Sequence, residues 1–249
     1  MPIRITRFVK YLLIANTVCF IIQQTSDQFF GGHLLNIFAL IPVHFVFHYK
    51  FWQLFTYCFL HADVMHLVLN LMMLVFIGSD LEALWGAPRF LKFYFFCSSC
   101  AGIIYLFLQL IIWQETGLYT PMVGASGAIY GLLVAYGIIY GERVFLFMLL
   151  FPMKAKHFVW ILVAVEFLTT LYSGRGGLAS AAHLAGMAAG FMYLWISARY
   201  KIYLRQKAMA PIKDSKLRLV VDNDKKRKPS FWSSSDSAKD NDDDPKTWH

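Results

Sequence analysis

The chain has 249 residues, of which 58% are hydrophobic and only 15% are charged, and its formal net charge is +8. A soluble domain of average composition carries about 25% charged residues, so this composition excludes an ordinary soluble enzyme and indicates a protein whose solvent is lipid. Because the basic residues follow the ends of apolar segments, the charge is explained by membrane topology and anionic lipid, and nucleic acid is not an expected partner.

Six apolar blocks approach or exceed the roughly 18 residues that cross a hydrocarbon core. They are Phe8–Gln24, Val64–Leu84, Phe90–Trp113, Ser126–Tyr140, His157–Tyr172 and Leu178–Ala198. The first block follows basic residues as a signal peptide would, but Gln23-Gln24-Thr25 has no small-residue cleavage signature, so we interpret it as a retained span. The predicted fold is an all-α integral membrane domain over residues 1–208.

Basic residues predict the orientation of these spans, because Lys and Arg in short loops stay on the cytoplasmic side. Those on the side of the N-terminus are Arg4, Arg7, Lys10, Arg89, Lys92, Arg143, Lys154, Lys156, Arg199, Lys201, Arg205 and Lys207. The opposite ends hold little beyond Lys50 and Arg175. Both termini are therefore expected in the cytoplasm.

Residues 209–249 differ in character from the rest of the chain. They carry Lys225-Lys226-Arg227-Lys228, a serine run and Asp242-Asp243-Asp244, with too few apolar residues for a core. A disordered, charged cytoplasmic tail is the favoured interpretation, and a docking or lipid-contact role for its basic part is the alternative.

About forty residues separate the first span from the second, whereas roughly 2 to 8 usually join the helices of a bundle. The segment Asn36–Phe51 is apolar, but Pro42 and several polar residues interrupt it. We expect a structured loop that lies in the outer membrane interface, in preference to a seventh crossing.

For the cysteines and for the histidines of the first loop, we favour structural roles over redox chemistry or metal binding. Cys97-Ser98-Ser99-Cys100 has redox-motif spacing, but it lies in an apolar span, where packing by small residues is expected instead. His33, His44 and His48 lack the spacing of metal ligands, so interfacial anchoring is favoured and no metal or cofactor is expected.

Ser126 stands where a loosened turn, Pro121–Ala125, meets an apolar helix. It is either an ordinary helix N-cap or a nucleophile open to a cavity, whose own N–H can donate to an oxyanion. From Ser126 to Tyr140 the helix covers about 22 Å of a core about 30 Å thick. Its start is therefore expected about 8 Å below the outer edge of the hydrocarbon.

Small residues and a histidine share one face of the last span, where they recur at spacings of four, three and four: Ala179, His183, Gly186 and Gly190. The fourth span offers a second small-residue face, so the two backbones can approach closely: Gly127, Gly131 and Ala135. His183 lies about 7 to 8 Å into its span. This match in depth favours a hydrogen bond to Ser126 over a purely structural histidine.

Other polar residues in the spans are candidates because intramembrane polar groups are costly. Tyr130 lies one turn from Ser126, where its ring can pack on an imidazole. His66 and Asn70, four residues apart, are either oxyanion donors or interhelical contacts. No acidic residue accompanies His183 on its helix, so a two-residue Ser–His arrangement is the simpler hypothesis. Glu166 either takes part in gating or substrate contact or makes a structural hydrogen bond to a neighbouring helix.

Three motifs in order resemble the rhomboid family of intramembrane serine proteases, over roughly Arg7 to Tyr200. They are His66-Leu67-Val68-Leu69-Asn70, Gly124-Ala125-Ser126-Gly127 and Ala182-His183-Leu184-Ala185-Gly186. The family's fold is a six-transmembrane-helix bundle with a long interfacial loop between the first and second spans. One departure is Trp52-Gln53, where many members carry Trp-Arg in that loop.

The resemblance implies a bacterial inner-membrane endopeptidase that cleaves in or near the transmembrane segments of single-span membrane proteins. Ser126 is then the nucleophile, His183 the base and later the acid, and Tyr130 the ring stacked on the histidine. The oxyanion donors are His66, Asn70 and the Ser126 N–H. The fifth span is implied to be the mobile side through which substrate enters, and no oligomeric state is indicated.

Two rival functions remain. A catalytically inactive rhomboid-like protein would bind or unfold membrane segments, but the presence of both Ser126 and His183 favours the protease. A small-solute transporter would show inverted repeats and a charged midplane site, and no repeat links the two halves of this sequence.

Overall fold

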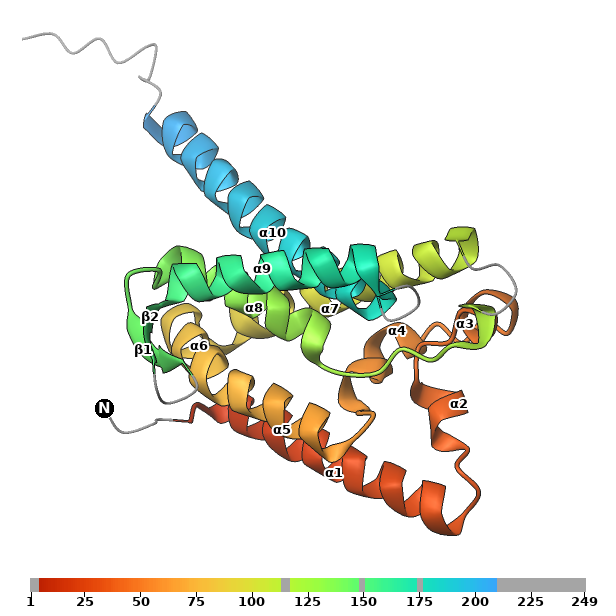
Figure 1. Ribbon diagram of the computed structural model, residues 1–249. Helices are drawn as coiled ribbons and strands as arrows, with labels where there is room; N and C mark the ends of the chain where they lie inside the picture. Colours follow the sequence, from red (N-terminus) through yellow and green to blue (C-terminus); the bar gives the residue numbers. More distant parts are fainter. Residues whose placement is uncertain (1–4, 113–116, 148–150, 174–176, 210–249) are drawn as a thin grey trace, which may run out of the picture. The chain divides into compact units, whose positions relative to one another are not determined.

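The computed structural model describes residues 5–112, 117–147, 151–173 and 177–209 (Figure 1). Within these ranges, five helical segments are long and apolar enough to cross a membrane: α1 (Arg7–Phe29), the continuous run of α5 (Val64–Met73), η2 (Leu74–Gly78) and α6 (Ser79–Trp85), α7 (Ala87–Ile112), α9 (Ala155–Tyr172) and α10 (Gly177–Met209). A shorter apolar helix, α8 (Ser126–Ile139), is the sixth. The predicted all-α bundle is confirmed.

The helices differ from the predicted spans mainly at their ends. α1 continues past Gln24, and α10 continues past Ala198 to Met209. Hydropathy marks the part of a helix that apolar solvent surrounds, whereas backbone hydrogen bonds continue wherever helix-forming residues follow. Trp113, the expected end of the third span, lies outside the described residues, as does the proposed tail apart from Met209.

The long first loop is structured, as expected, and contains four short elements: α2 (Leu34–Phe38), α3 (Pro42–Phe47), α4 (Gln53–Thr56) and the 3₁₀ turn η1 (Tyr57–Phe59). Pro42 begins α3, where its fixed φ favours the first helical turn. The Trp52 indole N–H donates to the Ile37 carbonyl at 2.9 Å. The place of this loop in the membrane interface stays a prediction.

Gln53, the departure from Trp-Arg, is fully buried and anchors the loop. Its amide oxygen accepts the Ile41 N–H at 3.2 Å, and its amide nitrogen lies 3.3 Å from the carbonyl oxygens of Asn36 and Ile37. A neutral amide suits this place because it satisfies buried backbone groups without burying a charge. The departure therefore leaves the loop well anchored.

A β-hairpin that the sequence analysis did not anticipate joins α8 to α9. Strands β1 (Val144–Phe147) and β2 (Phe151–Lys154) pair antiparallel. At its base the exposed Glu142 accepts from the ammonium groups of Lys154 and Lys156, and these bonds lower the pKa of its carboxyl to about 2.

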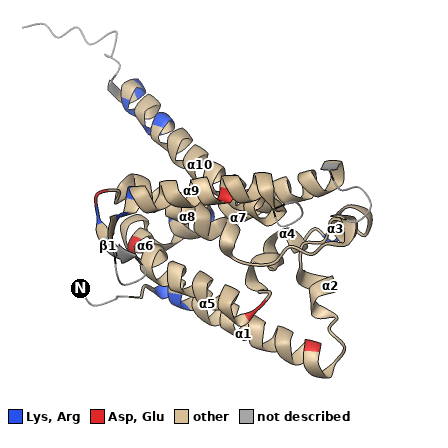
Figure 2. Cartoon of the chain, viewed as in Figure 1, with Lys and Arg blue, Asp and Glu red and all other residues tan. Residues whose placement is uncertain are grey.

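Several helix ends meet on one side of the bundle. The buried Glu82 carboxylate accepts the backbone N–H groups of Phe8 and Val9, at 3.1 and 2.8 Å, and the Thr6 hydroxyl. Asp80 pairs with Arg143 just beyond α8. The start of α1, the end of the second span and the end of α8 therefore share a side. Figure 2 shows Lys and Arg at the start of α1 and towards the end of α10.

The predicted close approach of α8 and α10 is confirmed. A Cβ atom added at Gly186 would clash with the carbonyl oxygen of Gly127. A Cβ atom added at Gly190 would lie 2.8 Å from the carbonyl oxygen of Gly131, which is also too close. At Gly131, α8 also packs against Cys97 of α7. All four cysteines are free thiols, and Cys97 acts in packing, as expected.

Candidate active site

The first loop holds the segment that presents Ser126. Leu40 and Met122 exchange two backbone hydrogen bonds, of 3.1 and 2.9 Å, and the Gly124 N–H donates to the Tyr57 carbonyl at 3.0 Å. Gly124 has a φ of +116°, a conformation that side chains disfavour, so glycine is needed to turn the chain into α8. Ser126 is the first residue of that helix and is 8% exposed.

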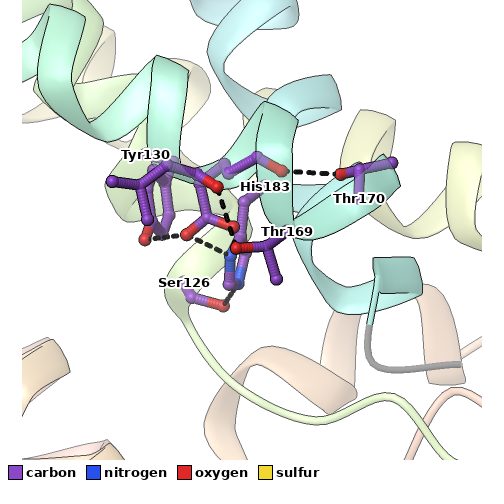
Figure 3. Close-up of polar contacts among 7 residues, drawn as sticks. Ser126, Tyr130, Thr169, Thr170 and His183 are labelled. Atoms are coloured by element: carbon purple, nitrogen blue, oxygen red, sulfur yellow. Dashed lines mark hydrogen bonds and ion pairs between the residues drawn. The ribbon is translucent and has the colours of Figure 1, made fainter. Parts of the chain in front are cut away.

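His183 of α10 faces this serine (Figure 3). Its Nε2 atom lies 2.8 Å from the Ser126 Oγ, which is hydrogen-bond distance. The Tyr130 ring stacks on the imidazole with centroids 4.3 Å apart and planes 15° from parallel. The structure therefore brings together Ser126 and His183, which were predicted to lie at one depth, and Tyr130, which was predicted one turn away. The contact needs the small faces of α8 and α10, since bulkier residues would hold the two backbones apart.

Glu166 of α9 completes this cluster from a third helix. One oxygen of its carboxylate lies 3.1 Å from His183 Nδ1 and also accepts a hydrogen bond from the Tyr130 hydroxyl. The residue is 8% exposed, and the Thr170 hydroxyl donates to its backbone carbonyl at 2.8 Å. The predicted hydrogen bond to a neighbouring helix is confirmed, and a role in gating or substrate contact stays a prediction.

An acidic partner for His183 could not be found along its own helix, because Glu166 belongs to α9 and His183 to α10. The sequence did single out Glu166, because a carboxylate in an apolar span is energetically costly and needs a partner, but it did not show that the partner is His183.

His66 and Asn70 occupy the facing helix α5. A Cβ added at Gly124 would lie 2.8 Å from His66 Nε2 and 3.7 Å from the Ser126 Oγ, so the His66 ring borders the turn that carries the serine. The Asn70 amide donates to the His66 carbonyl at 2.9 Å. An amide nitrogen has two N–H groups, so this bond leaves Asn70 a second donor.

The helices and the site define a multi-pass integral membrane protein with a buried serine hydrogen-bonded to an imidazole. This arrangement of nucleophile and base can support acyl transfer, with donors on a second helix beside it. The sequence model of the Rhomboid domain matches residues 48–200, which is more than half of the chain. The chain belongs to the rhomboid family.

Relatives come from bacteria, plants and protozoa. Rhomboid-like protein 19 of Arabidopsis thaliana is 30% identical over 68% of this chain and 57% of its own length. YdcA of Bacillus subtilis is 30% identical over 61% of this chain and 70% of its own length. Rhomboid-like protease 3 of Toxoplasma gondii is 33% identical over 34% of this chain and 29% of its own length. The chain thus spans a little over half of the first of these relatives.

Proposed function

We propose that this chain is an intramembrane serine endopeptidase that hydrolyses peptide bonds in or near the transmembrane segments of single-span membrane proteins. The observation that carries the proposal is the 2.8 Å contact between Ser126 Oγ and His183 Nε2 at a buried site among membrane-length helices. Family membership supports it, because rhomboids include serine proteases and relatives from Bacillus subtilis and Toxoplasma gondii carry protease in their names.

In the first half of the reaction, the Ser126 Oγ attacks the carbonyl carbon of the substrate while its proton passes to His183 Nε2. The carbonyl oxygen takes up the negative charge and is stabilised by N–H donors from Ser126, His66 and Asn70. When this intermediate collapses, the C–N bond breaks. The imidazolium gives its proton to the departing amine, and an acyl-serine ester remains.

In the second half, a water molecule attacks the ester carbonyl and gives its proton to His183 Nε2. Collapse of the second intermediate breaks the bond between the acyl carbon and Ser126 Oγ, which recovers the proton from the imidazolium. The sum is one peptide bond hydrolysed by one water. Water needs a path into the bundle to reach Ser126.

The second candidate is an inactive rhomboid-like protein that binds or unfolds membrane segments. The serine hydroxyl aligned on an imidazole favours the protease, because binding a helix requires neither group at hydrogen-bond distance from the other.

Covalent labelling tests the nucleophile. A fluorophosphonate probe is expected to label the detergent-solubilised protein at Ser126, and Ser126→Ala is expected to lose the label because no other group is paired with His183 Nε2 among the described contacts. Peptide mass spectrometry locates the adduct, and Ser197→Ala in the C-terminal half of α10 serves as the matched control that keeps it.

Equal labelling of the wild type and Ser126→Ala would overturn the nucleophile. Labelled wild type that fails to cut a panel of single-span substrates in proteoliposomes would overturn the endopeptidase and leave the inactive relative as the better account.

We also propose a bacterial inner-membrane location with both termini in the cytoplasm. Basic residues accompany the helix ends that meet beside Glu82 and Arg143, and such residues are retained in the cytoplasm. A green fluorescent protein fused to the C-terminus is expected to fluoresce, and an alkaline phosphatase fused there to be inactive. A phosphatase fused between α7 and α8 is the control and should be active. The reverse pattern would contradict this orientation.

A further inference from the structure

A buried carboxylate inside a membrane span requires partners, because a charged group without them is costly in an apolar medium. Its partners include the Tyr130 hydroxyl from α8, and the Ser180 hydroxyl and His183 Nδ1, the latter at 3.1 Å, from α10. Tyr130 and His183 approach the same carboxylate oxygen of Glu166. The position of this oxygen is therefore determined by two helices that also carry the serine and the histidine.

The hydrogen-bond roles follow from the chemistry of the groups. An ionised carboxylate only accepts, so the bond from His183 places a proton on Nδ1. In a neutral imidazole the other nitrogen is then an acceptor, and Nε2 is the nitrogen that faces Ser126 Oγ at 2.8 Å. One contact on the far side of the ring thus selects the tautomer that can take the serine proton.

Building on the proposed function, we infer that Glu166 is a positioning residue that completes a Ser126–His183–Glu166 triad. The carboxylate holds the imidazole with Nε2 towards the nucleophile and stabilises the imidazolium that forms when the serine proton is transferred. The stacked Tyr130 ring restricts tilting of the imidazole, while the carboxylate determines which nitrogen carries the proton. Because Glu166 belongs to α9, the triad is assembled from three different helices.

The competing explanation is that Glu166 only ties α9 to its neighbours. A structural tie would affect thermal stability, and it would affect turnover only as far as the fold loosens. A positioning carboxylate would affect kcat with little change in KM, because it acts once substrate is bound and the proton moves.

The experiment compares cleavage of a single-span substrate by wild type, Glu166→Gln and Glu166→Asp in proteoliposomes, with Ser126→Ala as the inactive reference. Glu166→Gln is expected to lower kcat about 10³- to 10⁴-fold with KM within about threefold, by analogy with triads that lose their acid. Glu166→Asp, which keeps the charge, is expected to recover at least about tenfold of that loss. Thr170→Val, which removes the hydroxyl bonded to the Glu166 backbone, is the matched control on α9 and should keep wild-type kcat.

Wild-type kcat in a folded Glu166→Gln protein would overturn the triad and leave the serine protease intact. Absence of any wild-type cleavage or fluorophosphonate labelling would instead overturn the proposed function, so the two failures are distinct. Equal loss of kcat in Glu166→Gln and Glu166→Asp with a matching loss of thermal stability would identify a structural tie.

A measurement that needs no Glu166 variant decides the matter if those variants do not fold. ¹⁵N-histidine spectra, with His183 assigned by its loss in His183→Ala, or in His183→Gln, should show a protonated Nδ1 and an unprotonated Nε2 in the resting protein. A proton on Nε2 would overturn the inference, since the carboxylate would then not select the tautomer.

Discussion

Replacing His183 by alanine is expected to lower kcat for cleavage of a transmembrane substrate by about 10⁵-fold or more, since a serine hydroxyl without its base is a weak nucleophile. KM should change little, because the imidazole contacts Ser126 and Glu166, and the proposal gives it no role in holding the substrate helix. Initial rates in proteoliposomes, with fluorophosphonate labelling as a second readout, check this expectation.

The same variant removes a partner of Glu166 and is expected to destabilise the protein by about 1 to 3 kcal/mol, the cost of a buried polar group that loses a hydrogen bond. His183→Ala combined with Glu166→Gln is the matched control: it should regain part of the thermal stability and none of the activity. A His183→Ala protein that keeps kcat within tenfold of wild type would show that another group acts as the base.

The second large effect is expected from Gly186→Ala. The new methyl group would press on the backbone carbonyl of Gly127, which cannot move unless α8 moves, and Ser126 is the adjacent residue. Overpacking of this kind costs about 3 kcal/mol, and a shift of about 1 Å between nucleophile and base lowers the rate about 100-fold. Thermal unfolding in detergent and kcat are the measurements.

Gly137→Ala provides the comparison for this prediction. Gly137 also lies in α8, but a Cβ there would meet only the side chain of Val159, with its nearest methyl at 2.9 Å. A side-chain methyl can give way where a backbone carbonyl cannot, so a loss below about 1 kcal/mol is expected. If Gly186→Ala were as stable and active as Gly137→Ala, the close approach of α8 and α10 would not be what aligns the site.

Much of this architecture could be predicted because lipid imposes simple rules on sequence. Apolar blocks marked the helices, and the spacing of small residues at Gly127 and Gly186 predicted which faces of α8 and α10 meet. The match in depth between Ser126 and His183 predicted their hydrogen bond. Each of these features depends on the positions of residues along a single helix, so the sequence of that helix is sufficient to predict it.

Features that depend on the rotation of a helix or on a local turn escaped prediction. The contact between Glu166 and His183 joins two helices, α9 and α10. The spacing of residues along one helix does not show how that helix is rotated relative to the other. The hairpin at Val144–Lys154 follows from a short connection between α8 and α9, where strand pairing competes with an irregular loop. The anchoring by Gln53 depends on carbonyl groups more than ten positions earlier in the chain.

The carboxylate of Glu82 also bears on how the chain assembles. A helix begins with N–H groups that lack acceptors within the helix, and at α1 two of these are satisfied by a residue 73 and 74 positions later. These two N–H groups of α1 therefore lack this protein acceptor until Glu82 has been synthesised. Both partners of this contact precede Ser126 in the chain, so they have been synthesised before the helix that carries this serine begins.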